Sequence, residues 1–145
     1  MPNSSCELTV LAFDFGMKRI GVAIGDTLSN SAKPLTTITA IDGIPNWDNI
    51  TALIKDWDAD TLIIGMPYNH DGSIQDITHS AKKFYNRIKS KYALPTHFID
   101  ERLTTKIAKI ELAKLHKNNY SIDSMAATLI LQSWLNEHQL GNKGV

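Results

Sequence analysis

The first forty residues alternate short apolar runs with breaks, a pattern that is typical of β-strands. Residues 8–14 are mostly apolar and β-favouring, and residues 19–25 carry an aliphatic side chain at every second position. The gap between these two runs is short and contains Gly16, so the runs are predicted to form a hairpin. Residues 35–40 are rich in threonine and alternate again, and we expect them to form an antiparallel neighbour.

Beyond residue 45 the apolar residues recur at helical spacing. Asn46 is a suitable N-cap for a helix that ends near Trp57, and Ser121 is a suitable N-cap for a last helix that ends near His138. Two further helices are predicted over residues 74–92 and 104–116, and two apolar strands over residues 61–65 and 96–100. The last helix is expected to be buried through Ile122, Ala126, Leu129 and Ile130.

The predicted order is three strands, a helix, a strand, a helix, a strand and two helices. Three antiparallel strands followed by strand–helix–strand crossovers predict an α/β fold, in which a five-stranded mixed sheet carries helices on both faces. The 145 residues suit a single domain, and neither a repeat nor a low-complexity segment divides them. Residues 1–145 are therefore interpreted as one domain, with flexible termini at residues 1–7 and 140–145.

Composition narrows the class of protein. Apolar residues make up 43% and charged residues 21%, as in folded globular chains rather than disordered ones. The single cysteine, Cys6, excludes an intramolecular disulfide and suits a reducing compartment. The N-terminus lacks the features of a signal peptide, and no apolar run approaches the ~20 residues that span a bilayer. The sequence therefore predicts a soluble, cytoplasmic protein that does not enter a membrane.

Charge is balanced over the whole chain but not along it. The 15 basic and 15 acidic residues cancel, which argues against tight, indiscriminate binding of nucleic acid. Residues 82–117, however, hold 10 basic and 3 acidic side chains, whereas residues 1–81 hold 4 and 10. The basic stretch is either a phosphate-binding face or the solvated side of two amphipathic helices, and charge alone favours the second interpretation.

Three carboxylates fall where predicted elements end or begin. Asp14 ends the first strand, Glu101 follows the strand over residues 96–100, and Asp123 lies in the first turn of the last helix. Chemistry in sheets of this type gathers at strand ends, so the three side chains could meet there. A cluster of carboxylates repels itself and needs a hard cation such as Mg²⁺ or Mn²⁺. Two such ions would activate a water and stabilise the leaving oxygen of a phosphodiester.

Each carboxylate also has a purely structural interpretation. Asp14 could set the turn before Gly16, Glu101 could form a surface ion pair, and Asp123 could complement a helix dipole. Other chemistry is less well supported, because the glycines form no nucleotide-binding motif, the five histidines have no zinc spacing and no nucleophile elbow is present. The polar loop that carries His70 is either a substrate contact or a simple turn.

Four sequence blocks resemble the YqgF/RuvX family. They are LAFDFGMKRIGVAIG over residues 11–25, LIIGMPYNHDGS over residues 62–73, IDERLTT over residues 99–105 and IDSMAA over residues 122–127. The blocks occur in the family's order, and the similarity extends over about residues 8–138. Members of this family are RNase H-like proteins regarded as nucleases of pre-16S ribosomal RNA or as Holliday junction resolvases.

The resemblance implies an RNase H-like fold and a metal-dependent nuclease. The family's acidic triad falls on Asp14, Glu101 and Asp123, which would bind Mg²⁺ or Mn²⁺ and catalyse cleavage at the 5′ end of pre-16S rRNA. Structured RNA and the assembling small ribosomal subunit are the implied partners, and the chain is expected to be a monomer or a weak homodimer. The candidate substrate contacts are Lys18, Arg19, Asn69, His70 and Arg102.

Two departures from the family pattern bear on the substrate: Met17 replaces a small polar residue, and the segment over residues 115–120 is short. Three other functions stay open. The same site in a dimer would suit a resolvase of branched DNA, and the basic stretch alone would suit a non-catalytic RNA-binding ribosome-assembly factor. Residues 14–16 also resemble the first phosphate loop of actin-like ATPases, but those proteins need a second lobe to close on ATP.

Overall fold

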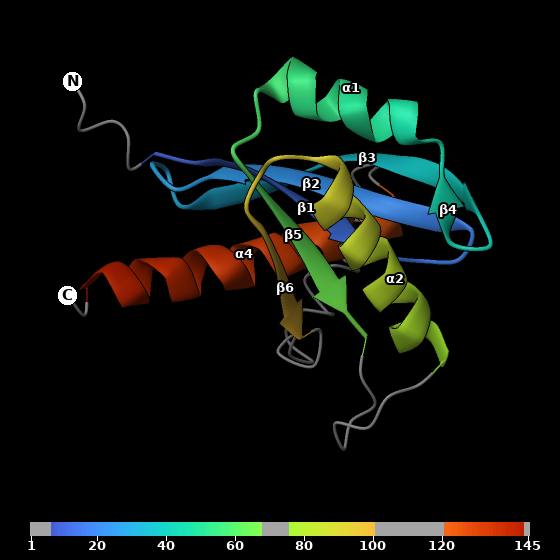
Figure 1. The fold of residues 1–145 in the computed structure, drawn as a ribbon. Coiled ribbons are helices and arrows are strands. Elements are labelled where there is room, and N and C mark those ends of the chain that lie inside the picture. The colour runs from blue at the N-terminus through green and yellow to red at the C-terminus, as the bar shows by residue number, and fades with distance from the viewer. Residues whose placement is uncertain (1–6, 68–75, 101–120, 144–145) are drawn as a thin grey trace.

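The computed structural model describes residues 7–67, 76–100 and 121–143, and they form a six-stranded sheet with helices on both faces (Figure 1). The strands are β1 (Thr9–Asp14), β2 (Arg19–Asp26), β3 (Ser31–Ile41), β4 (Ile44–Pro45), β5 (Thr61–Met66) and β6 (Thr96–Asp100). The helices are α1 (Trp47–Trp57), α2 (Asp76–Lys91) and α4 (Ile122–Lys143). The predicted α/β architecture is confirmed, and the helix predicted over residues 104–116 lies outside the described residues.

The order of the strands across the sheet is β4-β3-β2-β1-β5-β6. The first four strands in the chain pair antiparallel, while β1, β5 and β6 run parallel, so the mixed sheet is confirmed. The predicted number of five strands is wrong by one. Asp42 and Gly43 have positive φ and turn the chain back, so that β4 pairs with the end of β3. A strand of two residues is too short to show an alternating pattern.

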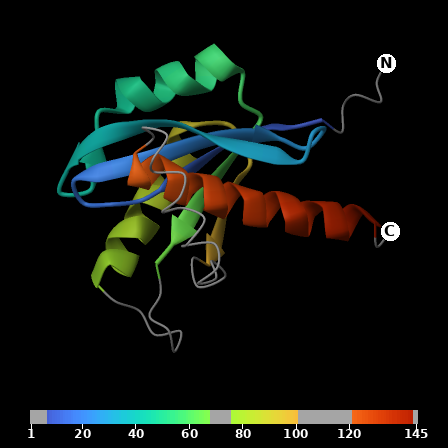
Figure 2. The ribbon, with the colours of Figure 1, turned by 180° about the vertical axis from the view of Figure 1, so that it is seen from behind.

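Side-chain alternation along β1 divides the core into two layers. Leu11 and Phe13 pack with α1 and α2, whereas Val10 and Ala12 pack with α4. Figure 2 shows the α4 side of the sheet, with the helix lying across it. The continuous burial of β5, which is fully enclosed by both layers, matches its prediction as a central parallel strand.

Both predicted N-caps are present. Asn46 accepts a hydrogen bond from the backbone N–H of Asp48 at 3.0 Å, and Ser121 Oγ accepts one from the backbone N–H of Ser124 at 3.0 Å. The last helix continues to Lys143 rather than ending near His138. None of the described helices is both long and apolar enough to cross a membrane.

The predicted buried face of the last helix is mostly wrong. Of the expected residues only Ile130 is fully enclosed, and Ile122 is 55% exposed. Apolar residues surround the first turns of this helix, so their spacing does not define a single stripe. Trp57, the last residue of α1, is 41% exposed. The apolar side chains that the described part of α4 buries are Met125, Ala127, Ile130, Leu131 and Leu135.

Candidate active site

The turn between β1 and β2 presents Asp14, Lys18 and Arg19 at the carboxyl end of β1. A side chain at Gly16 would overlap the backbone carbonyl of Arg19, so this tight turn requires a glycine. The turn is also held by the end of β3 and by the connection from β3 to β4. The backbone N–H of Ala40 donates to the Lys18 carbonyl at 2.8 Å, and that of Gly43 donates to the Met17 carbonyl at 2.9 Å. Hydrogen bonds therefore fix the backbone of the turn that carries Lys18 and Arg19, the two cationic residues predicted to contact the substrate.

Gly21 sets the distance between α4 and the sheet. A Cβ atom there would overlap the Asp123 carbonyl and would lie 2.8 Å from the backbone nitrogen of Ser124. The first turn of α4 therefore lies directly on the backbone of β2. Gly21 is also the cross-strand partner of Asp14 in the β1–β2 pair. The structure thus brings the start of α4, with Asp123, next to the end of β1, with Asp14.

Asp14 lies on the face of the sheet that α4 covers. Val10 and Ala12 belong to the layer packed against α4, and side chains on a strand alternate between faces, so position 14 shares their face. Asp14 and Asp123 are both partly buried. Two of the three predicted carboxylates, 109 residues apart in the sequence, therefore lie side by side at one edge of the sheet.

Arg19 pairs with the second of these carboxylates. Its Nε donates to Asp123 Oδ2 at 3.0 Å, and 66% of its side chain is exposed. A pair this exposed contributes only about 0–1 kcal/mol to folding. Since Nε is one of five guanidinium N–H donors, the side chain can orient Asp123 and still offer donors to a phosphate. Arg19, predicted as a substrate contact, is thus also a neighbour of a predicted metal ligand.

A chain of hydroxyl groups anchors the start of α4. Thr37, the cross-strand partner of Gly21 on β3, shares a hydrogen bond of 2.6 Å with Ser121 Oγ. Ser121 Oγ in turn donates to Ser124 Oγ at 2.8 Å, and Ser124 is buried. Sequence reasoning did not identify Thr37 and Ser124 as supporting residues. The signals for them were present in the threonine-rich strand and in the two serines three residues apart.

The strand that precedes the third predicted carboxylate ends at the same edge of the sheet. Asp14 pairs with Gly65 on β5, Gly65 pairs with Ile99 on β6, and Asp100 ends β6. Glu101 is the next residue and lies outside the described residues. Within the described ranges no group of three metal-ligating side chains is found. The candidate contacts Asn69, His70 and Arg102 also lie outside the described residues.

The donor atoms at this edge suit a hard divalent cation. Carboxylate oxygens are the preferred ligands of Mg²⁺ and Mn²⁺, and softer metals favour the sulfur and imidazole groups that Asp14 and Asp123 do not supply. Both side chains are partly buried, which lowers the local dielectric around them. The residues that the structure describes at this edge therefore fit the predicted cation.

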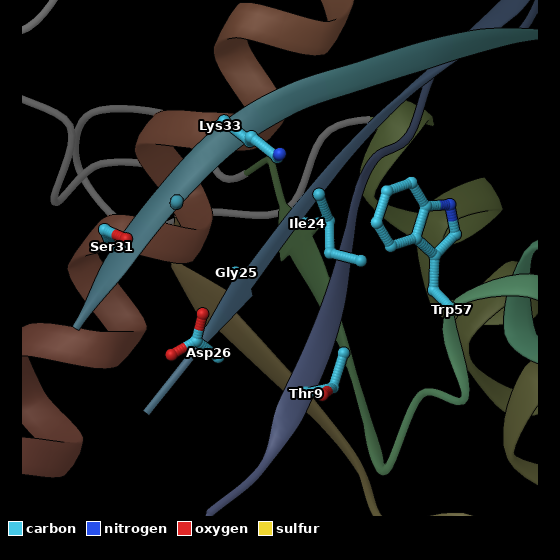
Figure 3. Close-up of a pocket in the computed structure, with 8 residues that line it drawn as sticks. Thr9, Ile24, Gly25, Asp26, Ser31, Lys33 and Trp57 are labelled. Atoms are coloured by element: carbon cyan, nitrogen blue, oxygen red, sulfur yellow. The ribbon is translucent and has the colours of Figure 1, made fainter. Parts of the chain in front are cut away.

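A pocket of about 360 Å³ lies at the opposite end of the sheet (Figure 3). Thr9, Asp26, Lys33 and Trp57 are among the residues that line it. Thr9 begins β1 and Asp14 ends it, so the two are separated by about 17 Å at ~3.3 Å per residue. Asp26 Oδ1 accepts hydrogen bonds from both the backbone and the hydroxyl of Ser29. This pocket is thus separate from the carboxylate site, and its acidic group holds a turn.

Comparison with known families gives one match that covers most of the chain. A family model described as "RuvX: Holliday junction resolvase" matches residues 8–137. A protein of Saccharophagus degradans named "Putative pre-16S rRNA nuclease" is 52% identical over 135 residues, which cover 90% of this chain and 94% of that protein. A protein of Coxiella burnetii with the same name is 45% identical over 141 residues, covering 96% of this chain and 99% of that protein.

Solved structures with a similar fold include two Holliday junction resolvases. Thermus thermophilus RuvC in complex with a Holliday junction superposes with a TM-score of 0.56 at 10% identity, covering 91% of this chain and 96% of that one. The yeast mitochondrial Holliday junction resolvase gives a TM-score of 0.53 at 11% identity, covering 92% and 80%. At such identities the likeness concerns the fold, and it confirms the predicted RNase H-like class.

Proposed function

This chain belongs to the RuvX family, and from that premise we propose that it is a metal-dependent nuclease that processes the 5′ end of pre-16S ribosomal RNA. Relatives at 45–52% identity carry this RNA in their names. The observation that best supports the chemistry is the close approach of α4 to Gly21, beside Asp14. This contact brings the backbone of Asp123 close to that of Asp14, which supports a site in which both carboxylates would bind a cation and a phosphodiester.

The proposed roles follow from the positions of the side chains. Asp14, Asp123 and Glu101 would hold Mg²⁺ or Mn²⁺. Bound there, a pair of ions supplies an activated water and stabilises the leaving oxygen. Arg19 orients Asp123 through its Nε and presents its remaining N–H groups to the substrate. The exposed Lys18 on the same turn adds positive charge for a phosphate.

The other partners are part of the same proposal. Arg102 would neutralise a phosphate, and Asn69 and His70 would line the substrate path. The enzyme would act in the cytoplasm on RNA of the assembling small ribosomal subunit. It would work as a monomer or a weak homodimer, since one acidic site suffices for one cut.

A cleavage assay with two substrates tests the proposal. A labelled pre-16S rRNA fragment and a four-way DNA junction are each incubated with Mg²⁺, Mn²⁺ or EDTA. We expect metal-dependent cutting of the RNA by the wild type and none by Asp14→Asn. The exposed α1 carboxylate Asp56 gives the matched control, because Asp56→Asn removes the same charge far from the site. Wild-type cutting by a folded Asp14→Asn variant contradicts the assignment.

Resolution of branched DNA is the second candidate function, because the matching family model is described as a resolvase. Cutting a junction symmetrically needs two acidic sites that face two strands, so this function requires a stable dimer. Junction cleavage together with a dimer in sedimentation would favour it. Sedimentation as a monomer at working concentration would count against it. RNA binding without any cutting would favour a ribosome-assembly factor instead.

A further inference from the structure

Phe98 is a large aromatic side chain exposed on the edge strand β6. It is 51% exposed, although it lies in the middle of a regular strand. Its ring packs edge-to-face against Tyr85 of α2, with centroids 5.6 Å apart and planes at 87°. The hydroxyl of Tyr85 donates to the carbonyl of Thr96 at 3.2 Å, which ties α2 to β6. Phe98 is therefore supported from beneath while about half of it faces solvent.

The surface next to Phe98 is basic. Lys89 Nζ lies 5.7 Å from the centroid of the Tyr85 ring, on the same helix. Lys82 precedes Tyr85 by three residues and so lies on the same side of α2. Along its length α2 carries one acidic residue, Asp76, and five basic ones: Lys82, Lys83, Arg87, Lys89 and Lys91. A single exposed apolar residue is ordinary on a protein surface, but an exposed ring bordered by lysines matches a ligand that is both flat and anionic.

The register of the sheet relates Phe98 to the carboxylate site. Phe98 pairs with Ile64 on β5, and Ile64 pairs with Phe13 on β1. Phe13 directly precedes Asp14. With strands ~4.8 Å apart and ~3.3 Å per residue, the Cα atoms of Phe98 and Asp14 are separated by about 10 Å. Phe98 shares the face of Phe13 and α2, whereas Asp14 lies on the α4 face, so the two side chains point to opposite sides of the sheet. Asp14 ends β1 and Phe98 lies two residues before the end of β6, so a single strand that reaches both would pass around the carboxyl end of the sheet. Single-strand-binding folds contact roughly 4–16 nucleotides, which is long enough for such a path.

We propose that Phe98 is a stacking position for an unpaired base in a single-stranded segment of the substrate, with Lys82 and Lys89 contacting the adjoining phosphates. Stacking on an aromatic ring suits this role because every base has a π-face, so the contact selects single strands without selecting a sequence. A base inside a duplex is covered on both faces and cannot use this ring. The inference rests on the proposed function, and it adds that the substrate is unpaired a few nucleotides from the bond that is cut.

Binding measured without cutting tests this inference. Fluorescence anisotropy in EDTA is recorded with a blunt RNA duplex and with the same duplex carrying a single-stranded 5′ tail. Phe98→Ala is expected to weaken binding of the tailed RNA roughly 5- to 150-fold, the range for loss of one base–aromatic stack, and to leave blunt-duplex binding unchanged. Phe98→Trp should retain the affinity, because its larger ring still stacks. Leu28→Ala is the matched control, because it removes another exposed apolar side chain, 75% exposed, from a turn at the far end of β2.

A fluorescent base placed along the tail separates stacking from a structural effect. Quenching at one tail position that disappears in Phe98→Ala supports the proposal, and an identical DNA tail should behave in the same way. Equal affinity of Phe98→Ala and wild type for the tailed RNA overturns the stacking site, and then the patch is better explained as a protein contact. If the wild type still cleaves in that case, the nuclease assignment stands. Absence of both cleavage and nucleic-acid binding by the wild type would overturn the two proposals together.

Discussion

Replacing Gly21 by alanine tests whether the close contact between α4 and β2 positions the carboxylates. The added Cβ would overlap the Asp123 carbonyl and lie 2.8 Å from the Ser124 nitrogen, whereas ordinary contacts begin at 3.4 Å. All of these atoms belong to the backbone, so no side-chain rotation relieves the clash. The first turn of α4 must therefore move away from β2 by on the order of 1 Å, in keeping with the backbone shifts that overpacking produces.

This displacement is expected to affect activity more than folding. Overpacking costs about 1–3 kcal/mol, which leaves a domain with a typical stability of ~5–15 kcal/mol folded. Movement of Asp123 away from Asp14 by about 1 Å is expected to lower kcat roughly 100-fold, since misplacement on that scale disrupts an aligned site. A 100-fold loss corresponds to about 2.7 kcal/mol of transition-state stabilisation.

The same strand offers a matched control. A Cβ at Gly25 would lie 2.5 Å from the Ser31 carbonyl oxygen and 3.1 Å from Leu131 Cδ2, so Gly25→Ala also crowds the sheet, but at its opposite end. Urea unfolding gives the stability of both variants, and single-turnover cleavage of the RNA fragment gives their rates. We expect both variants to lose stability and only Gly21→Ala to lose rate. Wild-type kcat in Gly21→Ala, or the same loss of rate in both variants, would refute the reasoning.

Three further predictions concern the site, the fold and the binding surface. Arg19→Ala should lower kcat of RNA cleavage about 10-fold or more, because it removes hydrogen-bond donors from the site. It should change the free energy of unfolding by less than ~1 kcal/mol, because the pair with Asp123 is exposed. An unchanged rate would argue that the pair plays no part in catalysis. Asn46→Ala should lower stability by ~1 kcal/mol in thermal unfolding, through loss of the α1 cap, with cleavage unaffected; a selective loss of activity would contradict this. Lys83→Glu should weaken RNA binding and reduce the slope of log affinity against log salt concentration by about one or two, because fewer counterions are released on binding. Binding titrations at several salt concentrations measure this slope. An unchanged slope would show that Lys83 of α2 does not contact the RNA.

Local pattern was sufficient for most of the fold. The hairpin of β1 and β2, the buried β5 and the caps at Asn46 and Ser121 all follow from neighbouring residues, and all are confirmed. The α4 face was not predictable in the same way, because apolar residues surround its first turns and only packing selects the inward side. The strand β4 depends on the positive φ of Asp42 and Gly43 and on pairing with β3, so periodicity contains no signal for it.

The candidate site was predictable in part for the same reason. Asp14 and Asp123 stand out because each ends or begins an element, which local pattern reveals. Their juxtaposition depends on Gly21, which is 102 residues from Asp123 and gave no local sign of contacting it. The pairing of Arg19 with Asp123 was likewise unpredictable, since it joins a hairpin to a helix across the sheet. The role of Glu101 stays a prediction.

One row of residues across the sheet accounts for how the fold builds this site. Register places Thr37, Gly21, Asp14, Gly65 and Ile99 in line on five neighbouring strands. Beside Asp14, glycine at position 21 admits the backbone of α4, and the next position in the row, Thr37, binds the N-cap of that helix through its hydroxyl. The strand end thus supplies one carboxylate, and the helix start supplies another at a distance set by backbone contact. Since a backbone contact leaves less freedom than a side-chain contact, the sheet itself constrains the separation of the two backbone positions that carry these carboxylates. Changes in surrounding surfaces, such as the ring of Phe98, can then alter which nucleic acid is bound without moving the acidic groups.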